Sequence, residues 1–422
     1  MFFLSCIVAA LSICAAVTHL LFAIYFRTKV ILQPAKAFAE GDGLASILMS
    51  IRGCDPSLEK SLQQLLNQDY SDYEIHLVVD HRRDAAWDMV HEIKERLDHD
   101  CRLTIHEMKK PLKTCGLKCS ALLEGLDEVH PNTKYLVLID ADVVPHESWL
   151  SQLIAPLSDK TVGAVTGNQW FEPTGSDAGS LLRSLWNAGA LAPTAIYGNP
   201  WAGTFSIRMR DFRRARLRKI WRKSIVDDGP IRQALQPLGL KIYFNPALIM
   251  VNRERCDLRY VQSYISRMLT WSRMYEPTFL NTLLHCIFVI SVLLVSMILV
   301  VASLTTGNFA SFAAVALGLV AAGILNTVSY VIVRNGVSDS SNFGQFPLPE
   351  MRVAKFLKLA LLTPIACVIY GYSCLQAAYR QKIQWRQITY ELKGRSGVKM
   401  TRYRPWVGEQ NQDENSKSEI SI

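Results

Sequence analysis

The chain has 422 residues, half of them hydrophobic, and a formal net charge of +9 at pH 7. A protein built only of soluble domains is excluded, because several apolar blocks are long enough to cross a bilayer, whose core takes roughly 20 residues of helix. Beside such blocks the basic excess suits the anionic face of a cytoplasmic leaflet, and we expect no nucleic-acid partner.

The first apolar block, residues 1–26, contains no Lys, Arg, Asp or Glu. A cleaved signal peptide is the alternative, but it would carry positive charge before the apolar run, whereas Arg27 and Lys29 follow it. We therefore predict an uncleaved transmembrane anchor with its C-terminal side in the cytoplasm. Residues 40–275, which have an ordinary soluble composition, then form one large domain.

The first half of this domain alternates between β-rich apolar runs and helical patterns. We predict strands at 45–51, 73–80, 102–108 and 135–142, and helices at 56–68, 85–97 and 117–129. Strand–helix repetition with short turns predicts an α/β fold, with a parallel sheet covered on both faces. Ligands of such sheets bind beyond the carboxyl ends of the strands, where Asp80 and Asp140 stand.

Two acids end the last of these strands, in "YLVLIDADVV", residues 135–144. Because strand side chains alternate, we expect Asp140 and Asp142 on one side, where they would hold Mg²⁺ or Mn²⁺ together with substrate phosphates. The alternative is that both acids cap the next helix, which begins near Glu147. Neither GxGxxG after the first strand nor GxxxxGK[ST] occurs, so a glycine-rich loop would not hold the phosphates.

A second acidic pair, Asp227 and Asp228, precedes Gly229 and a predicted helix. An acid before a helix is ordinarily its N-cap. Two adjacent acids allow one to cap the helix while the other faces a cleft as a base. Upstream, "NPWAGTFSIR" (199–208) predicts a glycine turn that leads into a strand.

Residues 211–223, just before this pair, carry seven Arg and Lys residues. We predict an interfacial amphipathic helix here, whose basic side chains face lipid headgroups. Its apolar side chains would enter the membrane interface: Phe212, Leu217, Ile220 and Trp221. The alternative is a solvated basic helix on the surface of the domain.

Three further apolar blocks follow the domain, at 279–304, 309–333 and 353–379. The third either crosses the membrane or, if Pro364 and Gly371 break it, forms a re-entrant hairpin. We favour the hairpin, because a full crossing would put a basic tail outside the cell. Residues 380–422 form this tail, basic first and then polar, and we expect 405–422 to be disordered.

The order of the motifs resembles that of a known family. After the anchor come "RGCDP", "VVDHRRDAAWD", "KCSALLEGL", "DADVVP", "AGTFSIR", "VDDGPIRQAL", "RMLTW", the apolar spans and "IQWRQITYELKG". This order is similar to the membrane-bound family 2 glycosyltransferases, and within them to the ceramide glucosyltransferase group, over roughly residues 45–395. The resemblance implies a cytosolic catalytic domain with the GT-A fold, which is Rossmann-like with a mostly parallel sheet, joined to α-helical transmembrane segments.

The resemblance also implies roles for individual residues. Asp80 or Asp84, which align equally well with the family's first aspartate, would contact the nucleotide. Lys118 would lie near the nucleotide, Asp140 would lie on the metal and sugar-nucleotide side, and Asp142 would complete a metal-binding DxD motif.

The remaining family motifs fall in the second half of the domain. Asp228 matches the catalytic base, and Asp227 lies beside it. The [Q/R]xxRW motif falls on Arg267 and Trp271, which are four residues apart and hence on one helical face, but Thr270 stands where the family has its second arginine. Arg267 or Arg273 would then supply the positive charge near the diphosphate. An ordinary Arg and Trp belt at a membrane interface is the alternative.

The activity implied by the resemblance is an inverting, non-processive transfer of a sugar, glucose first among the candidates, from a UDP-sugar to a membrane lipid hydroxyl. The acceptor would be ceramide, diacylglycerol or a similar lipid, and the cofactor Mg²⁺ or Mn²⁺. The alternatives are a processive polysaccharide synthase and a catalytically degenerate membrane scaffold, which Thr270 favours.

Overall fold

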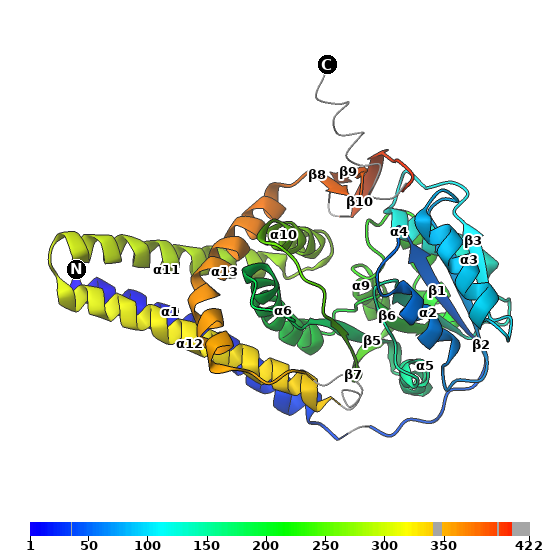
Figure 1. Ribbon diagram of the computed structural model, residues 1–422, viewed down its shortest axis with the longest axis horizontal. Helices are drawn as coiled ribbons and strands as arrows, with labels where there is room; N and C mark the ends of the chain where they lie inside the picture. The colour runs from blue at the N-terminus through cyan, green and yellow to red at the C-terminus, as the bar shows by residue number, and fades with distance from the viewer. Residues whose placement is uncertain (35, 341–347, 395, 407–422) are drawn as a thin grey trace, which may run out of the picture. The chain divides into compact units, whose positions relative to one another are not determined.

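A computed structural model of the chain describes residues 1–34, 36–340, 348–394 and 396–406 (Figure 1). Its internal contacts divide it into two compact units. The membrane-helix unit consists of Met1–Ala35, Gln169–Tyr197 and Val251–Arg380, and the sheet unit of Lys36–Asn168, Gly198–Met250 and Gln381–Ile422. The chain therefore passes from one unit to the other at five points. The predicted domain 40–275 is divided between the units.

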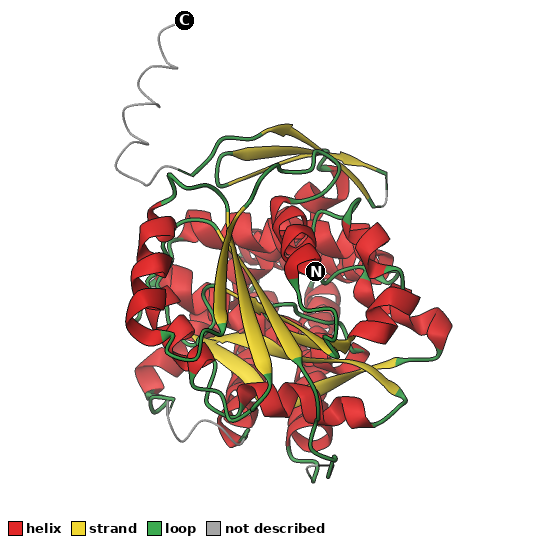
Figure 2. Ribbon diagram, turned by 90° about the vertical axis from the view of Figure 1, so that its right-hand side faces the viewer, coloured by secondary structure: helices red, strands yellow, loops and turns green. Residues whose placement is uncertain are grey.

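The larger sheet has seven strands in the order β3-β2-β1-β4-β6-β5-β7 (Figure 2). The first four strands in the chain pair in parallel, and β6 pairs antiparallel with β4 and β5. The strands are β1 (Ala45–Ile51), β2 (Tyr73–Val79), β3 (Leu103–Glu107), β4 (Tyr135–Asp140), β5 (Val162–Phe171), β6 (Thr204–Arg208) and β7 (Lys241–Asn252). This arrangement confirms the predicted α/β class with a mostly parallel sheet.

Both faces of this sheet are buried, which explains why its strands are almost continuously apolar. Successive residues of β1 face different cores: Ile47 and Met49 pack in one, and Leu48 in the other. The helices of this region are α2 (Leu58–Leu66), α3 (Ala85–Leu97), α4 (Leu117–Glu128) and α5 (Trp149–Ile154). Each predicted strand and helix up to residue 142 lies within two residues of an observed one.

The segment 211–223 is not one amphipathic helix, so that prediction is wrong. Its two short helices, α7 (Met209–Arg214) and α8 (Leu217–Trp221), are separated by Arg216, whose backbone is left-handed at φ 54°. Phe212, Leu217 and Trp221 are buried in a core of the sheet unit and cannot enter a membrane interface. The apolar positions of this segment are therefore explained by the folding of the domain.

The C-terminal segment forms a second sheet where the sequence analysis expected only a tail. Its antiparallel strands are β8 (Lys382–Trp385), β9 (Ile388–Lys393) and β10 (Gly397–Arg402). Positive φ at Arg386 and Gln387 makes the two-residue turn between β8 and β9. Alternate residues are buried, among them Ile388 and Tyr390. The disorder expected for 405–422 concerns mostly residues 407–422, which lie outside the described residues.

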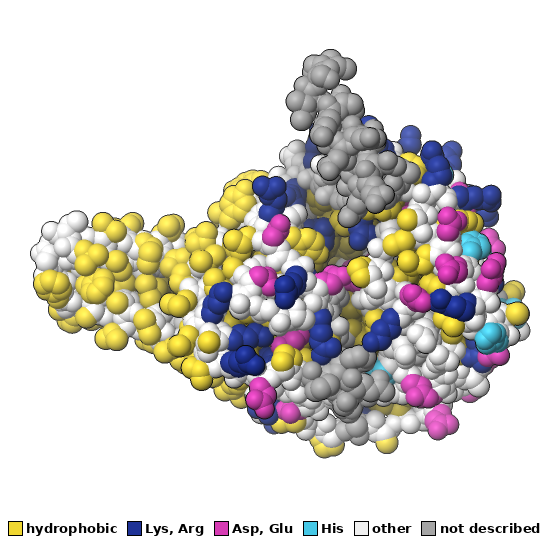
Figure 3. Space-filling model, in the orientation of Figure 1, with side chains coloured by type: hydrophobic (Ala, Val, Ile, Leu, Met, Phe, Trp, Pro, Cys, Tyr) yellow, Lys and Arg dark blue, Asp and Glu magenta, His cyan; other side chains and the backbone are white. Residues whose placement is uncertain are grey.

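The membrane-helix unit contains four helices that are long and apolar enough to cross a membrane, among the described residues. These are α1 (Phe2–Tyr25) with its π-helical extension Phe26–Ile31, α11 (Phe279–Thr305), α12 (Phe309–Asp339) and α13 (Val353–Tyr379). Hydrophobic side chains cover the visible surface of the long helices (Figure 3). Two further helices of this unit are α6 (Ala178–Tyr197) and α10 (Leu258–Tyr275).

The third C-terminal block, α13, runs as one continuous helix through Pro364 and Gly371. Gly371 serves close packing, because a Cβ atom there would stand 2.9 Å from Ile290 Cδ1 on α11. The break that a hairpin would need at Pro364 is therefore absent from this helix. The sides of a membrane on which the two ends of α13 lie stay a prediction.

Candidate active site

Lys118 joins two acidic segments that are distant in the sequence. Its Nζ atom, in the first turn of α4, lies 2.5 Å from Asp140 Oδ1 at the end of β4 and 3.0 Å from Asp227 Oδ2. Burial opposes the charge of Lys118, but Asp140 and Asp227 outweigh this effect and hold its pKa well above the usual value. A charged lysine thus lies between two carboxylates at the predicted ligand edge of the sheet.

Gly116 allows α4 to approach the second acidic segment. A Cβ atom at this position would stand 2.0 Å from the carbonyl oxygen of Ile225, which no side chain can do. The Gly116 N–H also donates a 2.8 Å hydrogen bond to Ser224 O. This close backbone contact brings the start of α4, and with it Lys118, against Asp227.

Asp227 is 3% exposed, and its backbone oxygen accepts a 2.8 Å hydrogen bond from Trp221 Nε1. Its Oδ2 atom lies close to Lys118 but accepts no well-aligned hydrogen bond from the described residues. Burial raises the pKa of Asp227, against the opposing charge of Lys118. Asp227 is therefore a buried carboxylate whose charge is balanced by Lys118.

Asp228 is only partly exposed and takes a 3.5 Å hydrogen bond at Oδ2 from the backbone N–H of Ala202. Burial and the neighbouring charge of Asp227 raise the pKa of Asp228 to about 7. Neither acid caps the following helix α9 (Ile231–Leu235), which begins after Pro230 without a side-chain cap. The capping alternative is therefore wrong, and Asp228 has the pKa of a general base for neutral pH.

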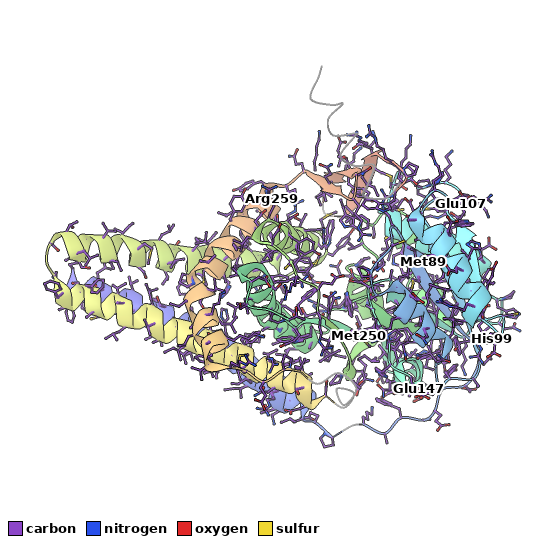
Figure 4. The ribbon with its side chains drawn as sticks, in the orientation of Figure 1. Met89, His99, Glu107, Glu147, Met250 and Arg259 are labelled. Atoms are coloured by element: carbon purple, nitrogen blue, oxygen red, sulfur yellow. The ribbon has the colours of Figure 1, made fainter. Side chains whose placement is uncertain are left out.

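The strand β4 ends at Asp140, two residues earlier than predicted. A turn follows, in which Val143 N–H donates a 3.1 Å hydrogen bond to Asp140 O, so strand alternation does not govern Asp142. The next helix was expected near Glu147, which Figure 4 labels. This helix is α5, and its N-cap Ser148 makes no side-chain cap. Asp140 and Asp142 therefore do not cap it either.

Asp140 keeps one oxygen, Oδ2, without a partner among the described residues. The described part of the chain contains no group of three or more His, Cys, Asp or Glu side chains arranged around a metal ion. Asp140 and Asp142 supply the carboxylate oxygens that Mg²⁺ and Mn²⁺ prefer. That these two acids hold such a cation, together with substrate oxygens, stays a prediction.

Asp80 and Asp84 have different surroundings. Asp84 caps α3, since it accepts hydrogen bonds from Ala86 N at 3.0 Å and Gly53 N at 2.8 Å. Asp80, at the end of β2, pairs with Arg52 and accepts a 2.8 Å hydrogen bond from the Tyr403 hydroxyl. Asp84 thus has a structural role, while Asp80 belongs to a polar and aromatic cluster.

The sequence analysis missed the partners of Asp80. The Arg52 guanidinium lies 5.8 Å and 5.6 Å from the ring centres of Tyr403 and Trp406, and the backbone N–H of Trp406 donates a 3.3 Å hydrogen bond to Asp80 Oδ2. Gly53, at φ 79°, makes room for the Trp406 ring, to which a Cβ atom would come within 2.8 Å. The alternation of apolar residues from 382 to 402 is the signal that indicates an ordered segment there.

Arg267 and Trp271 lie on α10, in the membrane-helix unit, whereas the acids belong to the sheet unit. The Arg267 guanidinium lies 5.8 Å from the Tyr264 ring centre, and no described residue forms an ion pair with it. Thr270 is buried and donates to Ser266 O at 2.7 Å. Arg273 donates to the last carbonyls of α13, so of the two candidate arginines Arg267 keeps its charge available.

Comparison with models of protein families gives a match to Glycosyl transferase family 21 over residues 4–398. No curated protein matches the chain.

Similar solved structures include the mannosyltransferase PcManGT from Pyrobaculum calidifontis in complex with GDP-Man and Mn²⁺, at 14% identity and a TM-score of 0.48, covering 88% of this chain and 99% of that chain. Glucosyl-3-phosphoglycerate synthase from Mycobacterium tuberculosis, in complex with Mn²⁺, UDP and phosphoglyceric acid, gives 16% identity and a TM-score of 0.35, covering 54% and 78%. At such identities and scores these likenesses carry no information about the substrates of this chain.

Proposed function

The chain belongs to glycosyl transferase family 21, and we propose that it transfers a sugar, glucose first among the candidates, from a UDP-sugar to the hydroxyl of a membrane lipid such as ceramide or diacylglycerol. The observation that carries this proposal is the acidic pair Asp227 and Asp228 at the carboxyl edge of the sheet, where Lys118 pairs with both Asp227 and Asp140. Four membrane-length helices support an acceptor that lies in the bilayer.

Asp228 is the proposed base. It takes the proton of the acceptor hydroxyl while the oxygen attacks the anomeric carbon, and the bond from that carbon to the diphosphate oxygen breaks. A single displacement of this kind inverts the configuration of the sugar. The partial exposure of Asp228 and its pKa of about 7 support the assignment, and Asp227 contributes the like charge that helps to raise this pKa.

Besides a base, the proposed transfer requires positive charge near the diphosphate, because this leaving group carries negative charge away from the sugar. Lys118 is charged and stands at the start of α4, beside Asp140. The family motif, and not a contact in the structure, assigns the further positive charge to Arg267, in place of the arginine that Thr270 replaces, with Trp271 on the same helical face.

A divalent cation, Mg²⁺ or Mn²⁺, would be held by Asp140 and Asp142 and would neutralise charge on the departing diphosphate. The unpartnered Oδ2 atom of Asp140 supports this assignment. We expect a chelator to abolish transfer and added Mn²⁺ or Mg²⁺ to restore it. Transfer that a chelator does not affect would remove the metal from this proposal.

Asp80 is the proposed contact to the nucleotide, and Asp84, the cap of α3, supports the turn that carries it. Because the donor is cytosolic, the proposal puts the sheet unit on the cytoplasmic side. Arg27 and Lys29, which follow the first membrane-length segment, favour the same orientation.

Lipid mass spectrometry of a heterologous host tests the whole proposal. Cells that express the chain should accumulate a new glycolipid, and cells that express Asp228→Asn at equal levels should not. A polysaccharide product in place of the glycolipid would favour the processive alternative. No product from either protein, with a chain that is folded in the membrane, would favour the degenerate scaffold.

A further inference from the structure

A groove of about 480 Å³ on the surface of the sheet unit combines an apolar floor with a strongly basic rim. Its apolar lining comes from Leu126, Val129, Met209 and Phe212, of which Val129 is partly exposed and the other three are buried. The rim is made of Arg213, Arg216, Arg218, Lys219 and Arg222. This groove is separate from the residues of the proposed active site, and its role does not depend on the reaction.

The carboxylates around the groove leave most of this charge uncompensated. Asp127 pairs with Arg218 at 2.5 Å. The buried Asp211 binds Arg208 and Arg214 instead of the rim. Arg213, Arg216, Lys219 and Arg222 therefore have no carboxylate partner among the described residues. Four unpaired cations around one concave surface produce a positive potential that attracts an anion.

The backbone is arranged so that both short helices contribute to the same rim. Arg216 adopts a left-handed conformation, φ 54° and ψ 32°, which non-glycine residues avoid. The turn separates α7 from α8, whose Phe212 and Trp221 rings pack with centres 5.1 Å apart, and cations on either side of it line one groove. Phe212, Leu217 and Trp221 hold the turn from within the core.

We propose that this groove binds the headgroups of anionic phospholipids at the surface of the membrane in which the chain is anchored. The chain passes between the sheet unit and the membrane-helix unit at five points, so the sheet unit cannot leave the neighbourhood of a bilayer in which the membrane-length helices are anchored. The cations supply contacts to the phosphate groups of lipid headgroups. Single-stranded nucleic acid fits less well, because Phe212 and Trp221 are buried and offer no surface on which bases could stack.

This proposal replaces the amphipathic insertion expected from the sequence. The apolar side chains of 211–223 fill the core of the domain, so contact with the membrane is electrostatic and lies at the headgroup level. Such contact weakens with salt, since the Debye length falls from about 10 Å at 0.1 M to about 3 Å at 1 M ionic strength.

Hydrogen exchange of the full-length protein in nanodiscs tests the proposal. Amides of 209–223 should exchange more slowly in discs that contain phosphatidylglycerol than in discs of phosphatidylcholine alone. The difference should disappear at high salt and in the triple variant Arg213→Gln, Lys219→Gln, Arg222→Gln. A matched triple variant of exposed lysines away from the groove should retain the difference: Lys110→Gln, Lys393→Gln and Lys399→Gln.

Several outcomes would overturn the proposal. Equal exchange of the wild-type segment in both kinds of disc would do so, whether or not the variants fold. If inorganic phosphate slowed the exchange of amides 209–223 in phosphatidylcholine discs as much as phosphatidylglycerol does, the groove would be a site for free anions. Protection by a single-stranded oligonucleotide at physiological salt, without any effect of phosphatidylglycerol, would identify a nucleic-acid surface.

Discussion

The neighbouring acids Asp227 and Asp228 have different surroundings, although they are adjacent in the chain. Asp227 is almost fully buried and its carboxylate faces Lys118. Asp228 is more exposed and has no lysine within ion-pair distance among the described residues, and its pKa is raised to about 7. Pairs of carboxyl groups whose surroundings differ in this way commonly divide structural and proton-transfer roles.

The pH dependence of the reaction follows from this difference. Because a base must be ionised and burial raises the pKa of Asp228, kcat/KM should rise with pH to a plateau, with a midpoint near pH 7. Below the midpoint it should fall about tenfold per pH unit. In Asp227→Asn the neighbouring negative charge is lost, so the pKa of Asp228 should fall and the midpoint should move to lower pH.

Initial rates over a pH series, measured in the same detergent for both proteins, check this shift. Asp228→Asn serves as the control and should have no rising limb at any pH. A midpoint that stays unchanged in Asp227→Asn would contradict the electrostatic coupling of the two acids.

The positions of the acids could be predicted from the sequence, but their contacts could not. Asp140 and Asp80 each end a short apolar run, a pattern that local periodicity indicates. The ion pairs of Lys118 depend on the approach of α4 to residues 224–228, which only the folded chain brings together. The local sequence likewise contains no pattern that predicts the backbone contact that Gly116 permits.

At the scale of elements, the local hydrophobic pattern was sufficient to predict β1 to β4. It was insufficient to predict the structure of two later segments. Residues 211–223 have helical spacing and many basic residues, yet the left-handed Arg216 divides them and the apolar side chains face the core. A sequence pattern cannot distinguish burial in a protein core from burial in a bilayer. The small sheet β8–β10 was missed because its basic residues suggested a tail.

The segment that follows β10 of this small sheet contacts Asp80, and removal of one hydroxyl group from it gives a second prediction. The Tyr403 hydroxyl donates a 2.8 Å hydrogen bond to Asp80 Oδ1, and Tyr403→Phe removes it while the ring remains beside Arg52. Hydrogen bonds to charged groups contribute about 1.5–3 kcal/mol. If Asp80 contacts the nucleotide, KM for the UDP-sugar should rise roughly tenfold while kcat changes little, since about 1.4 kcal/mol corresponds to a factor of ten.

Steady-state kinetics with varied UDP-sugar at saturating lipid measure this effect. Tyr379→Phe removes a hydroxyl from a tyrosine that is 82% exposed and should leave both constants unchanged. A fall in kcat without a change in KM would show that Tyr403 does not act through nucleotide binding.

At the scale of the whole molecule, the two units differ in whether their apolar residues are buried or exposed. The sheet unit buries apolar residues on both faces of a sheet, whereas the membrane-helix unit exposes apolar residues on its long helices. The membrane-helix unit also buries charge: Glu172 is 1% exposed in its side chain and pairs with Arg334 at 3.0 Å and with Lys355 at 3.4 Å. These contacts link α12 and α13 to the end of β5.

Removing the single acid of this cluster should destabilise the membrane-helix unit. Glu172→Gln leaves the buried Arg334 and the partly buried Lys355 without this carboxylate, and breaking a buried ion pair in this way costs about 3–5 kcal/mol. The thermal unfolding temperature of the detergent-solubilised protein should fall clearly. Asp339→Asn is the matched control, because it breaks the ion pair with Arg27, in which both side chains are 36% exposed, and such pairs contribute about 0–1 kcal/mol. Equal changes in the two variants would mean that the Glu172 cluster holds the helices together no better than a surface pair does.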